Sequence, residues 1–270
     1  SMFEELLANV RTKTPIVHCI TNYVTVNDCA NIVLAAGGSP IMADDLAEVE
    51  DITSISSALV INIGTLNART IQSMIAAGQK ANALQIPVIL DPVGAGASKL
   101  RDQTVAELLA KVQFAVIRGN ISEIKAVALG SGTTKGVDAD AADQLNESNQ
   151  ADVIAFAKKL SLDTGAVIAI TGKEDLITNG TDCYLIRNGH PMMSKITGSG
   201  CMLTCVIGCY LGANADPLTA ASAAVCAMGL CGELAYHEAI GTASFRTALI
   251  DAMSLLTPEQ LTGGAQVERL

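Results

Sequence analysis

Short apolar runs alternate along this chain with longer segments whose apolar residues recur every three or four positions. The short runs are typical of buried strands, and the longer segments are typical of helices that lie on a sheet. We expect strands at 15–20, 58–63, 87–90, 114–117 and 166–170, and helices at 26–36, 68–84, 104–111, 121–129 and 152–160. This alternation predicts an α/β fold of three αβα layers, with helices on both faces of a mostly parallel central sheet.

The later part of the chain departs from this pattern. Asn179-Gly180 and Asn188-Gly189 flank the run 184–187, and Asn-Gly pairs favour hairpins, so we expect an antiparallel edge there. Residues 130–150 are polar, acidic and rich in turn formers, which predicts a surface excursion, and the chain from about residue 200 onward has a largely helical pattern. No linker rich in Pro, Ser or Gly divides the sequence, so we expect a single domain, 1–270.

Composition narrows the range of partners. Half of the 270 residues are hydrophobic and only 3% are aromatic, so we expect a large core of Ala, Val, Ile and Leu. The net charge of −10 argues against nucleic acid and anionic membranes as partners, and an anionic ligand would need local positive charge. No apolar run reaches the length of a membrane span, and the N-terminus does not resemble a signal peptide. We therefore expect a cytoplasmic protein.

Eight cysteines also fit the cytoplasm. They include no CxxC pair and lie mostly within apolar segments, which indicates reduced thiols rather than disulfides. Cys201, Cys205 and Cys209 recur every four residues along one stripe of a helix. The latter two are expected to be small buried hydrophobes, whereas Cys201 follows an unusual turn.

That turn lies in the segment 196–203, where two glycines and two hydroxyl residues lead into an apolar, helix-compatible stretch. The first amides of a helix lack partners and carry partial positive charge, so anions bind there. Gly198 and Gly200 would let the backbone approach a phosphate, and Ser199 or Thr197 would cap the helix or donate a hydroxyl. Cys201 would then lie at the mouth of the site. The alternative is that these glycines only make a turn.

Other chemistry follows the predicted strands, where open parallel sheets bind their ligands. The segments in question are Thr21-Asn22-Tyr23, Gly64-Thr65-Leu66, 91–96, Arg118-Gly119-Asn120 with Glu123, and Thr171-Gly172-Lys173. Asp91 and Glu123 are candidate ligands of Mg²⁺, directly or through water, while Arg118 and Lys173 would face phosphate. Taken singly, each residue also has a structural explanation, as a turn cap, a first-turn acid or a solvated charge. Taken together with 198–201, they favour a phosphoryl-transfer site.

Two common nucleotide motifs are missing from the sequence. The Gly172-Lys173 pair has Val167 at the position of the first P-loop glycine and Glu174 at the position of Ser or Thr. No GxGxxG follows the first strand, which disfavours a classical dinucleotide-binding domain. The three histidines, His18, His190 and His237, lack the spacing of metal ligands.

Five segments together resemble the hydroxyethylthiazole kinase family: 20–31, 39–43, 91–96, 117–124 and 197–202. The similarity runs from about residue 3 to 256, and several long motifs in one order are far more specific than any single one. The resemblance implies a ribokinase-like fold without a separate lid domain. It also implies that ATP and Mg²⁺ are used to phosphorylate the alcohol of 4-methyl-5-(2-hydroxyethyl)thiazole, a salvage step towards thiamine.

The resemblance further implies roles for individual residues. Met42 and Gly198 are similar to substrate contacts of the family, and Asn22 and Val24 are similar to residues that line its thiazole pocket. Arg118 and Thr171 resemble ATP contacts, Asp91 and Glu123 lie in motifs associated with Mg²⁺ and phosphates, and the catalytic segment is Gly198, Ser199, Gly200 and Cys201. The family forms trimers with sites between subunits, so a neighbouring chain is a candidate source of Met42 and Thr21-Asn22.

The departures from the family pattern are small. Ser199 replaces the more usual Thr, and Ile121-Ser122 precedes Glu123 where small residues are common. Cys201 stands where most ribokinase-like enzymes have Asp as a candidate base, as it does in this family. A thiol is mostly protonated at neutral pH, although a helix N-terminus is expected to lower its pKa. Because phosphoryl transfer depends mainly on alignment and charge neutralisation, we assign most of the catalysis to the 198–201 amides, Mg²⁺ and Arg118.

Two other interpretations stay open at this point. One is another ribokinase-like enzyme, such as a hydroxymethylpyrimidine kinase or an ATP-dependent dehydratase of damaged nicotinamide cofactors. The other is a nucleotide-binding protein without catalysis. Met42 and the motif at 20–31 favour the thiazole kinase, and a protein that only binds would have little use for Asp91 and Glu123 beside phosphates.

Overall fold

The computed structural model describes residues 3–133 and 145–270. Within them, one sheet has the strand order β2-β1-β3-β4-β5-β6-β7-β8-β9. The strands are β1 (Ile16–Ile20), β2 (Ser39–Ile41), β3 (Ala58–Asn62), β4 (Val88–Asp91), β5 (Val116–Gly119), β6 (Val167–Ile170), β7 (Asp175–Thr178), β8 (Cys183–Ile186) and β9 (Val267–Arg269). Neighbours from β2 to β6 pair in parallel, and those from β6 to β9 pair antiparallel. The mostly parallel sheet with an antiparallel edge is thereby confirmed.

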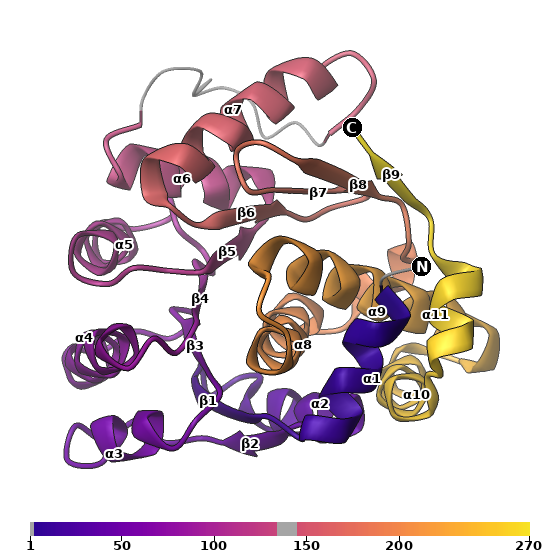
Figure 1. Cartoon of the computed structure of the whole chain (residues 1–270), viewed down its shortest axis with the longest axis horizontal. Coiled ribbons are helices and arrows are strands. Elements are labelled where there is room, and N and C mark those ends of the chain that lie inside the picture. The colour runs from indigo at the N-terminus through magenta and orange to yellow at the C-terminus, as the bar shows by residue number, and fades with distance from the viewer. Residues whose placement is uncertain (1–2, 134–144) are drawn as a thin grey trace.

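Helices cover both faces of this sheet (Figure 1). One face carries α3 (Val49–Ser54), α4 (Ala68–Ala83), α5 (Lys99–Lys111), α6 (Ile121–Gly130) and α7 (Gln150–Thr164). The other carries α1 (Phe3–Lys13), α2 (Val26–Ala36), α8 (Ser199–Ala213), α9 (Pro217–Glu238), α10 (Thr242–Leu255) and α11 (Pro258–Gly264). A 3-10 helix, η1 (Pro191–Lys195), leads into α8. The three expected αβα layers are therefore present.

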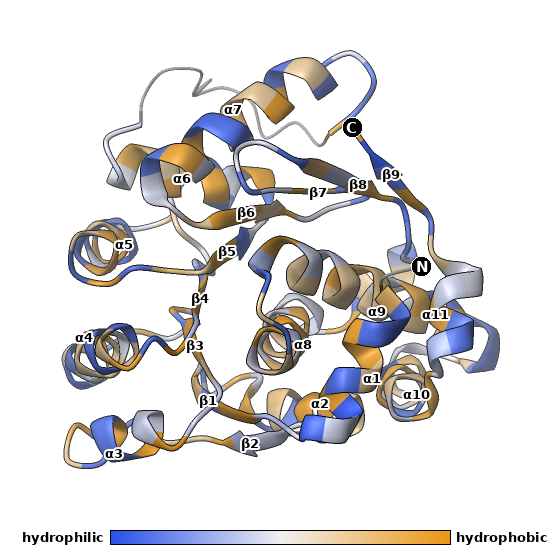
Figure 2. Cartoon of the chain, in the orientation of Figure 1, coloured by the Kyte–Doolittle hydropathy of each residue, from blue (hydrophilic) through white to orange (hydrophobic). Residues whose placement is uncertain are grey.

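Strands β1 and β3 to β8 contribute to two apolar cores because successive side chains point to opposite faces. In β3, Leu59 and Ile61 join the core under α4, whereas Val60 joins the core under α8. In Figure 2 the central strands are largely orange, while α4 and α5 also carry blue residues. Strands buried on both faces explain the continuous apolar runs of the sequence.

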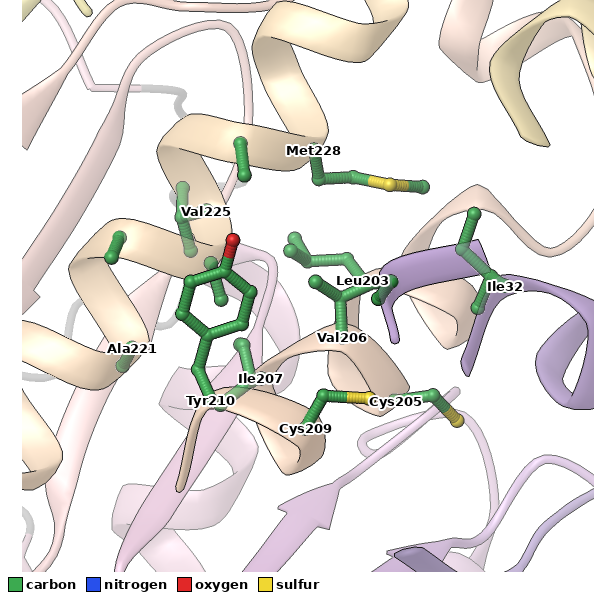
Figure 3. Close-up of a cluster of buried hydrophobic side chains, with 14 of the residues drawn as sticks. Ile32, Leu203, Cys205, Val206, Ile207, Cys209, Tyr210, Ala221, Val225 and Met228 are labelled. Atoms are coloured by element: carbon green, nitrogen blue, oxygen red, sulfur yellow. The ribbon is translucent and has the colours of Figure 1, made fainter. Parts of the chain in front are cut away.

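Helix α8 lies deep in the second core. Figure 3 shows Tyr210, Leu203 and Val206 of this helix packed beside Val225 of α9 and Ile32 of α2. At Gly208, a Cβ would lie 3.0 Å from Val17 and 3.1 Å from Val60. The absence of a side chain at this position therefore lets α8 lie close to the sheet, which fixes the height of its N-terminus above the strand ends.

Helix α9 is the one helix of the described chain that is long and apolar enough to cross a membrane. Of its most apolar window, 83% is buried inside the protein, and the helix packs between α8 and α10. It is built as a core helix, and the structure gives no positive sign of a membrane.

The structure contains one helix that the sequence pattern did not predict, and it lacks one predicted hairpin. The helix α1 was not apparent from the pattern, and the hairpin predicted at Asn188-Gly189 is wrong, although Asn179-Gly180 does join β7 to β8. The Asn188 side chain is buried and donates to Glu233 Oε2 (2.7 Å) and Gly264 O (2.9 Å). These bonds hold the chain after β8 against α9, and no hairpin forms there. Strand β8 pairs instead with β9, which is distant in the sequence.

Two further sequence predictions concern the segment 130–150 and the cysteines. The surface excursion predicted at 130–150 falls largely on residues 134–144, which lie outside the described residues. The eight cysteines are all free thiols and all buried, as their spacing indicated.

Candidate active site

The carboxyl ends of β1, β3, β4, β5 and β6 meet at one edge of the sheet, beside the N-terminus of α8. Asp91 is the last residue of β4, Arg118 lies inside β5, and Thr171 directly follows β6. The parallel strands therefore bring together residues that are far apart in the sequence. The predicted phosphate-facing residues gather here, with two of them inside the strands rather than after them.

A buried ion pair lies at the centre of this edge. Arg118 Nη2 donates to Asp91 Oδ1 at 3.0 Å, and the two residues are 7% and 0% exposed. Thr204 of α8 joins the pair, because its hydroxyl accepts from Arg118 Nε (2.9 Å) and donates to Asp91 Oδ2 (2.8 Å). The pair is thus held from both the sheet and α8.

Arg118 also lies beside Thr171 and the start of α8. Its Nη1 donates to Thr171 Oγ1 at 2.8 Å, and a Cβ on Gly200 would lie 3.2 Å from its Nη2. Burial lowers the pKa of Arg118, but the neighbouring carboxylates of Asp91 and Glu123 more than offset this, and the net shift is upward. The guanidinium therefore stays charged next to the start of α8.

Burial is also the main influence on the carboxyl group of Asp91. It raises the pKa of Asp91, while Arg118 and Thr204 oppose the rise and Glu123 adds to it. A buried carboxylate is stable only with such partners. The guanidinium of Arg118 and the hydroxyl of Thr204 therefore stabilise the buried carboxylate of Asp91.

The start of α8 has the geometry expected of an anion site. Gly198 caps the helix in the left-handed region (φ +87°) without a side-chain cap bond, so the capping expected from Ser199 or Thr197 is wrong. The first amide hydrogen bond of the helix runs from Met202 N to Gly198 O, at 2.8 Å. Within the described chain, the amides of residues 199–201 make no backbone hydrogen bond. Free first-turn amides of this kind bind anions.

A chain of amide side chains reaches Cys201 from the sheet. Asn22, which follows β1, donates from Nδ2 to Cys201 Sγ (3.4 Å) and to Asn62 Oδ1 (3.0 Å). Asn62, the last residue of β3, donates in turn to Asp91 Oδ2 (3.4 Å). The thiol is therefore linked through two carboxamides to the buried ion pair.

The pKa of Cys201 moves opposite to the expected direction. Burial raises it first, and the negative charge of Asp91 raises it further, while the nearby polar side chains of Thr25 and Asn62 oppose the change. The expected lowering by the helix N-terminus is overridden because the thiol is only 8% exposed and a carboxylate lies nearby. Cys201 is therefore a thiol rather than a thiolate at neutral pH.

Glu123 connects two loops of the site. Its Oε1 accepts from the amide of Asn120 and its Oε2 accepts from the amide of Gly94, each at 2.9 Å. Asn120 caps α6 in return through Glu123 N (2.8 Å). The carboxylate thus holds the loop after β4 against the start of α6, and each of its oxygens keeps a lone pair.

A pocket of about 330 Å³ opens beside Asn22. Its lining residues are Cys19, Thr21, Asn22, Tyr23, Val26, Met42, Asp44, Thr65, Asn67, Arg69 and Thr70. The predicted substrate contacts Met42 and Asn22 both line it within one chain. A neighbouring chain is thus not needed to supply Asn22 to Cys201.

The remaining predicted residues are less directly placed. Val24 is 60% exposed and does not line the pocket, and Lys173 is exposed in the β6–β7 loop. Gly198 lies against Thr25, since a Cβ there would be 2.7 Å from Thr25 Cγ2. A larger hollow of about 510 Å³ lies at the opposite edge, around Val88 and Ala115, and holds none of the predicted site residues.

Asn62 and Thr204 are site residues that sequence reasoning missed. Each did leave a signal: Asn62 interrupts the apolar run 58–63, and Thr204 is a hydroxyl in the apolar helix, one turn after Cys201. A polar residue at the carboxyl end of a buried strand needs a buried partner. This requirement could have identified Asn62 and Thr204 as members of the site.

Comparison with known proteins agrees with this geometry. A sequence profile described as the "Hydroxyethylthiazole kinase family" matches residues 7–259. A curated hydroxyethylthiazole kinase of Clostridium acetobutylicum is 58% identical over 271 residues, with 99% of each chain covered. Another, from Desulfovibrio desulfuricans, is 50% identical and covers 100% of this chain and 99% of its own.

Among solved structures, a hydroxyethylthiazole kinase protein of Pyrococcus horikoshii OT3 matches with a TM-score of 0.91 at 32% identity. The match covers 100% of this chain and 99% of that one. A ribokinase-like superfamily protein of Enterococcus faecalis V583 matches with a TM-score of 0.62 at 12% identity, covering 93% and 89% of the two chains. This second likeness is one of fold alone.

Proposed function

The chain belongs to the hydroxyethylthiazole kinase family, and from that membership we propose how its site carries out the reaction. The enzyme phosphorylates the hydroxyl of 4-methyl-5-(2-hydroxyethyl)thiazole in thiamine biosynthesis and salvage. Its ribokinase-like fold is the one expected from the sequence. The residue roles that follow are our proposal.

The observation that carries this proposal is the position of the free α8 amides between two different surfaces. On one side lies Arg118 with Asp91 and Thr171, and on the other lies the Met42 pocket, connected through Asn22. The thiazole binds against Met42 with its hydroxyl directed at Cys201. The transferring phosphoryl group of ATP binds the amides of 199–201, and Arg118 neutralises its charge.

The start of α8 and the guanidinium of Arg118 together suit a phosphoryl-transfer transition state, which depends more on alignment of the reactants than on removal of the alcohol proton. The transferring group spreads negative charge over its equatorial oxygens, and fixed donors stabilise such charge without reorganising. Cys201 receives a hydrogen bond from Asn22 and has a raised pKa. We therefore give its thiol the role of orienting the alcohol, with proton removal late and minor.

The donor set is compatible with Mg²⁺ that arrives on the nucleotide. No group of three or more His, Cys, Asp or Glu residues in the described chain is arranged to hold a metal ion. Both oxygens of Asp91 are already engaged and fully buried, so direct coordination does not fit it. Glu123 keeps a lone pair on each oxygen, and Mg²⁺ usually retains waters and substrate phosphates as ligands. We propose Glu123 as its anchor through water, where the ion would neutralise phosphate charge.

We further propose that the enzyme is a single-domain cytoplasmic protein that assembles as a homotrimer. The continuous sheet supports one domain, and eight free thiols together with the use of ATP support the cytoplasm. Tyr23, which lines the pocket, is 80% exposed, and Val24 next to it in the chain is 60% exposed, which supports coverage by another subunit. Light scattering after gel filtration tests the trimer: three times 27.8 kDa is expected, and 27.8 kDa alone would contradict it.

Coupled ADP release with the thiazole alcohol, and separately with the hydroxymethylpyrimidine alcohol, tests the proposed function. We expect turnover with the thiazole alcohol to be well above that with the pyrimidine alcohol. Met42→Ala should raise the KM for the thiazole with little change in the KM for ATP. Lys111→Ala, at the exposed C-terminal end of α5 away from the site, serves as the control. Background rates with both alcohols would overturn the proposal.

A further inference from the structure

Asn62 occupies an unusual place for a carboxamide. It is 1% exposed, at the end of a strand whose other residues are apolar, and every polar atom of its side chain is used. Its Oδ1 accepts from Gly64 N (2.9 Å) and Asn22 Nδ2 (3.0 Å), and its Nδ2 donates to Asp91. Because a backbone amide can only donate, Gly64 fixes which end of the Asn62 carboxamide is oxygen.

The orientation of Asn22 is fixed in the same way. Its Oδ1 accepts from the amides of Val24 (3.1 Å) and Thr25 (3.0 Å), and from the Thr25 hydroxyl (3.0 Å). Its Nδ2 must therefore point the other way, with one hydrogen to Asn62 and the other to Cys201 Sγ. The Cys201 sulfur is thus an acceptor in this pair.

We propose that Asn62 is a positioning residue for phosphoryl transfer, which holds the Asn22 carboxamide so that the Cys201 sulfur accepts its hydrogen bond and leaves the thiol proton free to meet the substrate alcohol. This inference rests on the proposed function and deepens it. Asn62 also donates to Asp91 (3.4 Å), a carboxylate that Arg118 and Thr204 already hold.

Several charged or titratable groups face Cys201 from the elements around it. They are Asp91 of β4, Arg118 of β5 and Cys29 of α2. Of these groups only Asp91 contacts Asn62, and after substitution of Asn62 it keeps its shorter bonds from Arg118 and Thr204. A change in Cys201 reactivity after that substitution would therefore report on the carboxamide chain.

The test compares Asn62→Ala, Asn22→Ala and the double variant in the full-length enzyme. We expect Asn62→Ala to lower kcat about threefold to tenfold with little change in the KM for ATP. Since Asn62 acts through Asn22, the double variant should lose no more than Asn22→Ala alone, a non-additive result. Asn82→Ala, which removes a carboxamide bonded to Gln113 at the other edge, is the matched control.

A second readout needs neither substrate nor turnover. Alkylation of Cys201 by iodoacetamide, followed at its own peptide by mass spectrometry across neutral to alkaline pH, should slow about threefold to tenfold at neutral pH in Asn62→Ala. The midpoint of the pH dependence of Cys201 alkylation should move to higher pH. If Asn62→Ala does not fold, Asn62→Ser, which keeps a polar atom in the buried position, carries the same expectation.

The outcomes separate this inference from the proposed function. An unchanged alkylation profile, additive losses in the double variant, or a loss of thermal stability alone would overturn the role of Asn62. Failure of the wild-type enzyme to phosphorylate the thiazole alcohol would instead overturn the proposed function, while the alkylation measurement would still report on Asn62.

Discussion

Arg118 and Asp91 form an ion pair of 3.0 Å whose side chains are 8% and 0% exposed, at the centre of the site. Removal of one partner leaves an uncompensated buried charge, which costs about 3–5 kcal/mol. We expect Arg118→Met to lose stability of this size in urea unfolding, and Arg118→Met with Asp91→Leu to recover much of it.

The exposed pair of Arg269 and Asp182, with side chains 66% and 42% exposed, supplies the control. Arg269→Met should change the urea midpoint little, because water screens such pairs. Equal losses for Arg118→Met and Arg269→Met would contradict the importance of the buried pair.

Cys201→Ser should retain substantial turnover. The serine hydroxyl still accepts from Asn22, and the backbone amides of 199–201 are unchanged. Steady-state kcat at saturating ATP and thiazole measures this. A kcat below about a thousandth of the parent, a loss of roughly 4 kcal/mol, would show instead that the thiol is essential as a base.

Gly198→Ala should be much more damaging to kcat than Cys201→Ser. Gly198 has φ +87°, and an added Cβ would lie 2.7 Å from Thr25 Cγ2, so the turn must move the amides that bind phosphate. Gly180→Ala is a close match, with φ +94° and a Cβ 2.7 Å from Leu162, but in the β7–β8 turn. It should lower stability and leave kcat unchanged, and an equal effect of the two variants on kcat would refute the amide cradle.

Asp175 should make stability depend on pH. Burial raises its pKa to about 7, against the opposing effects of the Gly172 amide and Arg118. The usual value is 3.8, so between about 4 and 7 the folded protein binds more protons than the unfolded chain and stability falls as pH rises. Asp175→Asn removes this loss. Its advantage should be absent near pH 4, grow towards pH 7 to a few kcal/mol at most, and then level off.

Thermal melting across this range measures the effect. Asp163→Asn is the control, since Asp163 is exposed on α7 and its bonds to Thr133 and Lys159 lower its pKa. Asp163→Asn should therefore gain nothing as pH rises. A constant difference between Asp175→Asn and the parent at every pH would contradict a buried, titrating carboxyl.

The sequence pattern predicted the layers and the edge at which the site lies, because both depend on local periodicity and on chain direction in parallel strands. Asp91, Arg118 and Thr171 could be placed at that edge from spacing alone. Their mutual contacts could not, because Thr204, which holds Asp91 and Arg118 together, comes from a helix 86 residues further along than Arg118. Helix docking of this kind leaves no periodic signal.

Cys201 is a case in which the local sequence predicted the wrong direction of a pKa shift. Its position at a helix start suggested a lowered pKa, since the local sequence carries the helix dipole but not the tertiary surroundings. Burial and Asp91 reverse the shift. The hairpin predicted at Asn188 failed for a similar reason, because Glu233 and Gly264, distant in sequence, use its side chain.

The two cores are assembled from the chain in different ways. The core under α4 to α7 draws its helices from one continuous part of the chain, whereas the core under α8 joins α1 and α2 with helices after residue 198. Contacts of long sequence separation form slowly because loops must close first. During synthesis one side of the sheet can thus be covered while Asp91 and Arg118 still await Thr204 and the Gly198 turn. Catalysis should be the last property to appear on refolding, and the first burst of ADP would time the docking of α8.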